Sequence, residues 1–393
     1  MKIKKVLVHG TEESLKEFFS DKLSKIKYNC LATLTDTNKN DMPTFVYQLI
    51  DAIVLTNKPT RKADIEYFKN YVESIKIICW NPDGYIEHFI EKADDGGDIY
   101  YAEGLQFHVH NAEEDRAFRN IRYYLYCQNQ FYLMDTKDYP AKVATDYKDY
   151  VGKPLDWNNL KTWTEKMQWI KLYDSTPIKT RLADKFLVRQ WITEKIGDEY
   201  LIPMLGAWDN FDDIDFDALP NQFVLKCNHG SGMNVICRDK KDFDIEKARE
   251  KINAWLAIDY GSLLFELHYN NIKKKIIAEK FMSDGINFEL TDYKFYCFEG
   301  KPVVLTCETE RTTNLKLDFF DMNWNHMDFE RADHPNSKHP ERLIKPKKFE
   351  LMKKLVTELC QGFIFVRVDF YEIEDKIYFS EITFVPGGHA VVY

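Results

Sequence analysis

Near the C-terminal end of the sequence, two β-rich runs carry a small set of charged residues. Residues 363–371 and 377–384 flank a short charged turn, which is the pattern of a β-hairpin. Arg367 and Asp369 are two positions apart, so an alternating strand directs both side chains to one face. If the runs pair about the turn between them, Glu381 of the second run lies roughly opposite Asp369.

Two carboxylates on one sheet face repel each other unless a cation lies between them. Hard oxygen ligands of this kind suit Mg²⁺ that bridges nucleotide phosphates, and Arg367 supplies a fixed positive fork at the same place. The alternative is a surface hairpin whose solvent face is charged, as the ordinary in/out alternation of a sheet produces. The hairpin residues alone leave both interpretations open.

The same stretch resembles the end of the ATP-grasp fold, in which an Arg-x-Asp strand, a short turn, a Glu-x-Asn strand and a Pro-Gly turn follow one another. The matching residues are Arg367, Asp369, Glu381, Pro386 and Gly387. Thr383 replaces the usual Asn, which puts one ligand of a second metal in question, although a hydroxyl can still hold a metal-bound water. The motifs Arg-Val-Asp-Phe-Tyr and Glu-Ile-Thr-Phe resemble more narrowly the teichuronopeptide-biosynthesis (TupA-like) branch of ATP-grasp proteins.

Composition limits the class of protein. With 393 residues, of which 45% are hydrophobic and 30% charged, the chain is long enough for two or three globular domains. A net charge of −9 argues against a general nucleic-acid or anionic-membrane binder. The sequence has no apolar run of about 18 residues and no signal-peptide pattern, so we expect no transmembrane segment and a cytoplasmic protein. The eight cysteines form no Cys-x-x-Cys pair and predict neither a zinc site nor a disulfide framework.

The first part of the chain alternates between strand and helix patterns, which predicts a small α/β domain with a parallel sheet. The expected elements are strands at 4–8, 31–34, 52–55 and 75–79 and a helix at 65–72. Thr11 and the acidic residues after it predict a capped helix start. Gly10 alone falls short of the dinucleotide fingerprint, which favours a structural or acceptor-related role. We place a Rossmann-like domain, a candidate for acceptor binding, at 1–150; residues 107–150 show no assignable pattern.

A helical connector is expected at 151–180, and the resemblance implies a two-lobed ATP-grasp domain of α+β type at 181–393, with lobes at about 181–282 and 283–393. Four-residue apolar spacing predicts one helix over 182–196. Lys185 lies in it, and the resemblance gives this lysine contact with a nucleotide phosphate. A solvated helical lysine is the alternative.

A lysine and a glycine-containing loop form the predicted phosphate site. Lys226 ends a strand, and a loop follows before the next strand at 235–237. A loop with glycines turns backbone N–H groups toward phosphate oxygens because no Cβ blocks the approach. The loop residues that we assign to nucleotide binding are His229, Gly230, Ser231 and Gly232. No Gly-Lys-Ser/Thr follows, so this is no Walker loop, but it resembles the lysine and glycine-rich lid of ATP-grasp proteins.

The strand at 276–281 resembles the hinge on which ATP-grasp proteins lay adenine, which they read through main-chain groups. The implied hinge residues are Glu279, Lys280, Phe281 and Met282. Asp292 and Lys294 share a face of the next strand, so a ribose-accepting carboxylate and a phosphate-reaching ammonium can lie side by side. A surface ion pair is the competing interpretation. Arg311 lies where TupA-like proteins keep an arginine.

Together these residues imply ATP and Mg²⁺ as cofactors, with Asp369, Glu381 and Thr383 as metal-site residues and Arg367, Arg311 and Lys294 as catalytic residues. The resemblance implies a ligase that joins a carboxylate, through an acylphosphate, to a small amine or amino acid. The acceptor would be a uronic acid, in free, nucleotide-linked or polysaccharide form, from surface-polymer assembly. A sugar or polyol kinase on the same fold and a non-catalytic partner of glycosyltransferases are the alternatives. The sequence does not decide the oligomeric state.

Overall fold

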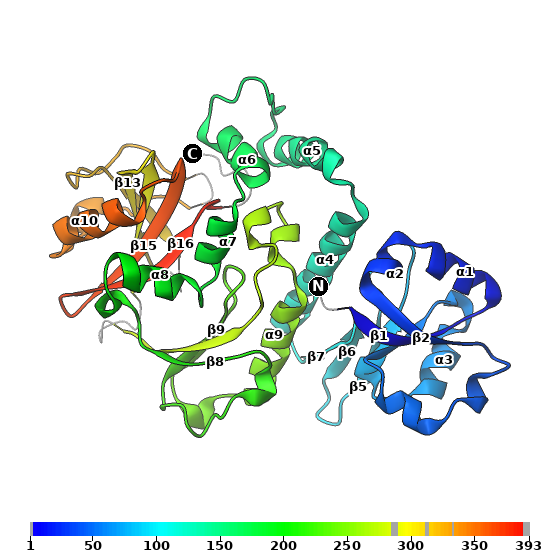
Figure 1. Ribbon diagram of the computed structural model, residues 1–393. Helices are drawn as coiled ribbons and strands as arrows, with labels where there is room; N and C mark the ends of the chain where they lie inside the picture. The colour runs from blue at the N-terminus through cyan, green and yellow to red at the C-terminus, as the bar shows by residue number, and fades with distance from the viewer. Residues whose placement is uncertain (1–2, 284–289, 311–313, 332–333, 388–393) are drawn as a thin grey trace. The chain divides into compact units, whose positions relative to one another are not determined.

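The computed structural model describes residues 3–283, 290–310, 314–331 and 334–387 (Figure 1). The chain forms two compact units, Met1–Thr136 with Asp244–Leu263, and Lys137–Phe243 with Leu264–Tyr393. Each unit mixes helices and sheets, which confirms the predicted α/β and α+β class. The domain boundaries 1–150, 151–180 and 181–393 stay a prediction.

The first unit is built on a four-stranded parallel sheet of order β2-β1-β3-β4, as the alternating pattern predicts. Its strands are β1 (Lys4–His9), β2 (Tyr28–Leu34), β3 (Ala52–Leu55) and β4 (Ile77–Cys79). Successive β1 residues are buried in two different clusters, with Val8 beside Phe18 of one helix and Leu7 beside Phe68 of another. Both faces of the sheet are therefore covered, which explains why β1, β3 and β4 contain continuous apolar runs.

The helices of the first unit include one that the sequence pattern did not reveal. They are α1 (Glu12–Ser20), α2 (Lys22–Lys27), α3 (Arg61–Phe68), α4 (Ala112–Leu133) and α9 (Ile245–Ala257), and a small antiparallel sheet joins β5 (His88–Lys92), β6 (Asp98–Ala102) and β7 (Leu105–Val109). Thr11 caps α1, as predicted. In α4 the buried Phe118, Ile121 and Leu125 have helical spacing and Asn111 is the N-cap, but exposed tyrosines between them hid the periodicity.

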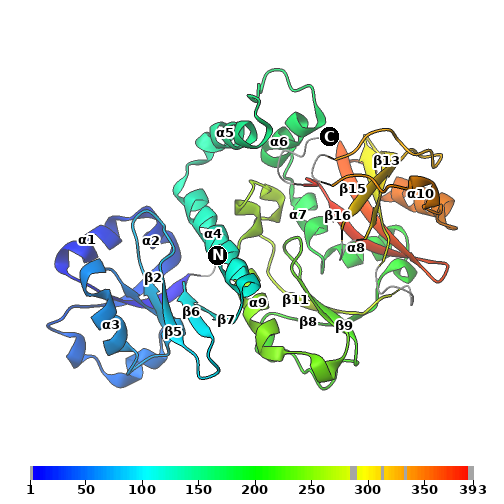
Figure 2. The same ribbon diagram turned by 180° about the vertical axis from the view of Figure 1, so that it is seen from behind.

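The second unit contains two antiparallel sheets (Figure 2). The four-stranded sheet has the order β10-β9-β11-β8, with β8 (Met204–Trp208), β9 (Phe223–Cys227), β10 (Asn234–Cys237) and β11 (Ile276–Lys280). The five-stranded sheet has the order β14-β13-β12-β15-β16, with β12 (Asp292–Phe298), β13 (Lys301–Thr309), β14 (Lys316–Phe320), β15 (Phe365–Ile373) and β16 (Lys376–Thr383). The helices are α5 (Tyr139–Val151), α6 (Trp163–Tyr173), α7 (Pro177–Ala183), α8 (Val188–Lys195) and α10 (Phe349–Leu359).

The two faces of the five-stranded sheet differ in character. Phe295 of β12 and Val368 of β15 are fully buried in one cluster with Met352 and Val356 of α10, and α10 lies along the sheet in Figure 1. Residues one position away on these strands, such as Lys294, point to the opposite face because side chains alternate along a strand. The helix-covered face anchors the sheet, and the opposite face carries the alternate residues of the strands, Lys294 among them.

The helix predicted over 182–196 is wrong, because the chain breaks between α7 and α8. The Asp184 carboxylate accepts hydrogen bonds from the backbone N–H groups of Phe186 (2.8 Å) and Leu187 (3.2 Å). The Lys185 N–H donates to the carbonyl of Asn228 (3.1 Å) instead of to an intrahelical acceptor. Asp competes in this way with helical hydrogen bonding, so Lys185 lies in a turn and not in a helix.

A buried histidine makes the second unit sensitive to acid. His268 is 1% exposed, and burial, with a further contribution from Lys179, lowers its pKa to about 3. An unfolded histidine has a pKa of about 6.5, so the unfolded state binds more protons between pH 6.5 and 3. Stability is therefore fully present above pH 6.5 and falls as the pH drops toward 3, by about 2 kcal/mol at pH 5.

Replacement of this residue tests the acid sensitivity. We expect the decrease in melting temperature between pH 7 and pH 5 to be smaller in His268→Phe than in the wild-type protein, because the variant has no imidazole to protonate. His339→Gln, which removes an exposed histidine, should behave as wild type. Equal decreases in wild type and His268→Phe would contradict the assignment.

No helix in the described part of the chain has both the length and the apolar character that crossing a lipid bilayer requires.

Candidate nucleotide and metal site

The hairpin of β15 and β16 places the two predicted metal ligands opposite each other. The strands pair antiparallel, with Asp369 facing Glu381 and Arg367 facing Thr383, so the predicted register is confirmed. The turn residues Glu374 and Asp375 both have positive φ, 48° and 60°, as the tight hairpin turns that match strand twist require. The turn and the alternation together fix which side chains share the face.

The cation that lies between the two carboxylates is the guanidinium of Arg367. Its Nη2 donates to Asp369 Oδ2 (2.6 Å) and to Glu381 Oε1 (2.7 Å), and its Nε donates to Asp369 Oδ1 (2.8 Å). Thr383 Oγ1 lies 3.4 Å from Glu381 Oε1. The repulsion between the two carboxylates is therefore offset by Arg367, which lies on the same strand as Asp369. A metal ion bound to these carboxylates would share them with Arg367.

The two carboxyl groups titrate differently. Asp369 is fully buried, and burial raises its pKa to about 6 although Arg367 and Lys294 oppose the shift. Burial also acts to raise the pKa of Glu381, but Lys185 and Arg367, with smaller contributions from other lysines, outweigh it and hold the pKa at about 2. Glu381 is thus ionised throughout the neutral range, as a ligand for a hard cation must be.

Lys294 lies among three carboxylates. Its Nζ is 3.0 Å from Asp292, 3.2 Å from Asp369 and 3.3 Å from Glu308. Burial works against the charged ammonium, but Asp369 and Asp292 outweigh it and raise the Lys294 pKa. The side chains of Asp292 and Lys294 are 3% and 9% exposed, so this is no surface ion pair. The predicted shared face is confirmed, whereas Glu308 was not identified from the sequence.

A second charged cluster lies on the four-stranded sheet. Glu279 of β11 accepts from Lys226 Nζ (2.6 Å) and from Arg189 Nη1 of α8 (3.0 Å). Burial acts to lower the Lys226 pKa, but Glu279 outweighs it and the pKa is raised. Arg189 also donates to the carbonyl of Ile202 (2.7 Å). The hinge role predicted for Glu279 concerned its main chain; the structure shows that its side chain positions two cations.

Lys185 connects the loop after β9 with the β15–β16 hairpin. Its Nζ donates to the carbonyl of Gly230 (2.5 Å) and lies 3.9 Å from Glu381 Oε2. Within the loop, His229 and Gly230 are buried and Ser231 and Gly232 are exposed. Gly232 has φ +71°, where a side chain would strain the backbone. The structure therefore brings the predicted lysine and the predicted glycine loop together.

The remaining predicted residues follow β11 or lie outside the described chain. Lys280 is the last residue of β11 and is exposed, whereas Phe281 and Met282 are half-buried. Arg238 lies over the Phe281 ring at 5.5 Å. Arg311 lies outside the described residues.

The charged groups of the second unit form one chemical environment. The cations are Lys185, Arg189, Lys226, Lys294 and Arg367, and the anions are Glu279, Asp292, Glu308, Asp369 and Glu381. They come from both sheets and from the α7–α8 segment. Such a set of fixed charges with a glycine loop can bind a polyphosphate and a divalent ion.

The family of the chain follows from comparison with known proteins. Residues 165–392 match the family model described as TupA-like ATPgrasp. The chain belongs to this family. Membership of this family indicates ATP-dependent ligation of the ATP-grasp type as the class of activity. The search of curated proteins finds no match.

The solved structures that this chain resembles include two ligases and a synthase. The D-alanine–D-alanine ligase from Bacillus anthracis in complex with ATP has 12% identity and a TM-score of 0.31, over 98% of this chain and 86% of that one. The ATP-grasp ligase PsnB with a minimal precursor, Mg and ADP has 7% identity and a TM-score of 0.31, over 98% and 90%. N5-carboxyaminoimidazole synthase from Aspergillus clavatus has 16% identity and a TM-score of 0.29, over 51% and 44%. At such scores these similarities carry no argument about the site of this TupA-like protein.

Two members of the site were not predicted from the sequence. Arg189 follows Lys185 on the same segment, but no local pattern distinguishes it from a solvated helical arginine. Glu308 faces Asp292 across the β12–β13 pair. The sequence could have identified Glu308, because a hairpin between these strands places the two residues opposite each other.

Proposed function

We propose that this TupA-like protein is an ATP-dependent ligase that joins a carboxylate to an amine through an acylphosphate. The observation that carries the proposal is the pair Asp369 and Glu381, which face each other on one sheet surface with Arg367, Lys294 and Lys185 around them. Buried and half-buried cations arranged about two carboxylates fit a polyphosphate with its metal ion, whereas a purely structural hairpin does not need them.

The donor set fits Mg²⁺. Carboxylate oxygens are its usual protein ligands, and Asp369 and Glu381 would hold the ion, with Thr383 beside them in place of the asparagine that is usual in ATP-grasp proteins. When bound, Mg²⁺ offsets the negative charge of the phosphate oxygens during transfer.

The protein's own residues then orient ATP. Lys226 and Lys185 would contact phosphate oxygens beside the loop of His229, Gly230, Ser231 and Gly232. The residues Glu279 to Met282 would hold adenine through their main chain, and Asp292 would accept a ribose hydroxyl. Arg189 keeps Glu279 paired and so fixes the direction of Lys226.

The proposed reaction has two balanced steps. A carboxylate oxygen of the acceptor attacks the γ-phosphorus, the bond to ADP breaks, and its electron pair leaves with ADP. The amine nitrogen then attacks the acyl carbon, the C–O bond to phosphate breaks, and a proton is released to solvent. Arg367, with Lys294 and Arg311, would stabilise the charge that develops on the transferring group and on the tetrahedral oxyanion.

We further propose that the acceptor is a uronic acid, free or within a nucleotide sugar or surface polymer, and that the reaction takes place in the cytoplasm, where ATP is available. The TupA-like family is the support for this substrate class. We propose that residues 1–150 bind the acceptor.

An assay of ATP turnover tests the proposal. We expect phosphate and ADP to appear only when a uronic acid and an amine are both present, the product to gain the mass of an amide, and EDTA to stop the reaction. Transfer of the phosphate onto the acceptor without any amine would instead identify a kinase. No turnover over the whole matrix of uronic acids and amines, with ATP bound, would contradict the proposed ligase.

A further inference from the structure

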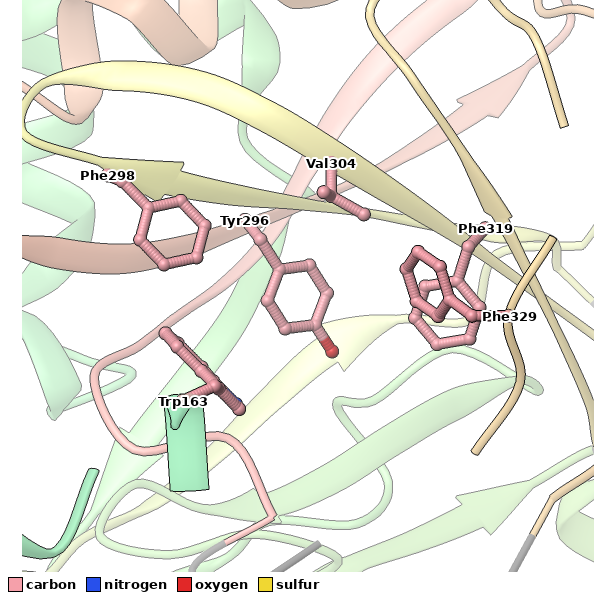
Figure 3. Close-up of a pocket in the computed structure, with 6 residues that line it drawn as sticks. All are labelled: Trp163, Tyr296, Phe298, Val304, Phe319 and Phe329. Atoms are coloured by element: carbon pink, nitrogen blue, oxygen red, sulfur yellow. The ribbon is translucent and has the colours of Figure 1, made fainter. Parts of the chain in front are cut away.

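An aromatic hollow lies on the same sheet as the charged site. It has a volume of about 220 Å³, and its lining residues are Trp163, Tyr296, Phe298, Val304, Phe319 and Phe329. Figure 3 shows Trp163 and Phe298 on one side, Phe319 and Phe329 on the other, and Tyr296 and Val304 between them. The residues come from α6, from β12, β13 and β14, and from the chain after β14.

Strand register makes the hollow adjacent to the proposed reaction centre. Tyr296 is paired with Arg367, and the next residue of β12 on the same face, Lys294, is paired with Asp369. On the other side of β12, Tyr296 is paired with Val304. Directly paired residues on one face have Cβ atoms about 5 Å apart. The charged row and the aromatic row are therefore neighbouring rows of a single surface.

A buried hydroxyl lies at the junction of these rows. Thr306 is paired with Lys294 on one side and with Phe319 on the other. It is 1% exposed, and its Oγ1 makes no hydrogen bond to the described part of the chain. A buried polar group without a partner is costly, so a ligand that offered one to Thr306 would gain affinity.

The lining favours an apolar ligand. Apart from the Tyr296 hydroxyl and the Trp163 indole N–H, the six side chains offer no hydrogen-bonding group. A sugar could stack its C–H face on these rings, but its hydroxyl groups would lose water without replacement. The volume exceeds the roughly 150 Å³ of an apolar cavity that takes up benzene. An aromatic ring or a branched alkyl chain fits both the size and the chemistry.

We infer that the hollow binds the apolar side chain of an amino acid, which the protein uses as the amine partner of the ligation. The inference rests on the proposed function and names the class of its second substrate. The amino nitrogen would reach the acyl carbon beside Arg367 while the side chain occupies the aromatic hollow, and the bonds formed and broken are those of the second step above.

Binding of L-phenylalanine to the full chain in the presence of Mg²⁺ and ADP, measured by titration calorimetry, tests this inference. We expect wild type to bind L-phenylalanine about ten- to a hundred-fold more tightly than glycine, as burial of one aromatic ring provides. Val304→Trp fills the hollow and should weaken phenylalanine binding at least ten-fold. The matched control is Val303→Trp, which adds the same bulk at the neighbouring, 47% exposed position of β13 that does not line the hollow and should leave phenylalanine binding unchanged.

Phe329→Ala, which removes one wall, is the second variant and should weaken phenylalanine binding without affecting ADP binding. Unchanged phenylalanine affinity in Val304→Trp and Phe329→Ala, or wild type that binds glucuronate but not phenylalanine, would overturn the inference. The proposed function can fail on its own. If phenylalanine binds with the expected variant pattern but no carboxylate gives phosphate release, the hollow is an amino-acid site and the protein is not the proposed ligase. If Val304→Trp does not change phosphate release, the proposed ligase stands and the hollow is not its amino-acid site.

Discussion

Asp369→Asn and Glu381→Gln are each expected to lower ATP turnover about a thousand-fold or more, because each removes one of the two oxygen anions that would hold Mg²⁺ at the phosphates. Asp369 is fully buried against Arg367 and Lys294. Its replacement leaves these cations with Glu381 and with Asp292 and Glu308 as partners. The fold should therefore persist, at a cost on the order of a few kcal/mol.

The pKa of Glu381 adds a second criterion. Because this pKa is held at about 2, the carboxylate is ionised from pH 5 to 9, and the defect of Glu381→Gln should not vary with pH over that range. Initial rates of ADP release, with circular dichroism as a check of folding, measure both effects.

Glu372→Gln is the matched control for these two variants. Glu372 also lies on β15, but it is half-buried and accepts hydrogen bonds from the backbone N–H groups of Lys347 (3.1 Å) and Lys348 (2.9 Å). Glutamine keeps one of the two acceptor oxygens, and the position is not among the proposed metal and nucleotide residues, so turnover should equal that of wild type. Near-normal turnover in both Asp369→Asn and Glu381→Gln would remove the metal assignment.

Lys226→Ala is expected to weaken ATP binding by about 10- to 100-fold, the loss that follows from removing one charged hydrogen bond to a phosphate. The raised pKa of Lys226 keeps the ammonium charged at neutral pH. Glu279 remains paired with Arg189 in the variant, so no buried carboxylate is left without a cation. The measurement is ATP affinity by titration calorimetry.

The control for this lysine is Lys241→Ala, which removes an exposed ammonium from the same unit. The ATP affinity of that variant should not change. An affinity of Lys226→Ala equal to that of wild type would exclude Lys226 from the nucleotide site.

The hairpin shows what sequence patterns predict well. Asp369 and Glu381 were placed opposite each other from side-chain alternation and the position of one turn, and β15 and β16 pair in that register. The segment before β8 shows the limit of prediction from such patterns. Apolar spacing predicted a continuous helix through Lys185. Instead, α7 ends at Asp184, whose carboxylate accepts from the N–H of Phe186, and Asn228, far along the chain, accepts the Lys185 N–H.

The sequence by itself determined the residue types of the site, the strands that carry them and the faces that they share, because turn formation and side-chain alternation act over a few neighbouring residues. The tertiary structure decided which distant residues meet. Arg189 reaches Glu279, and Tyr296 lies beside Arg367, because helix packing and β12–β15 pairing join segments separated by tens of residues. Aromatic residues from separate segments line one hollow for the same reason.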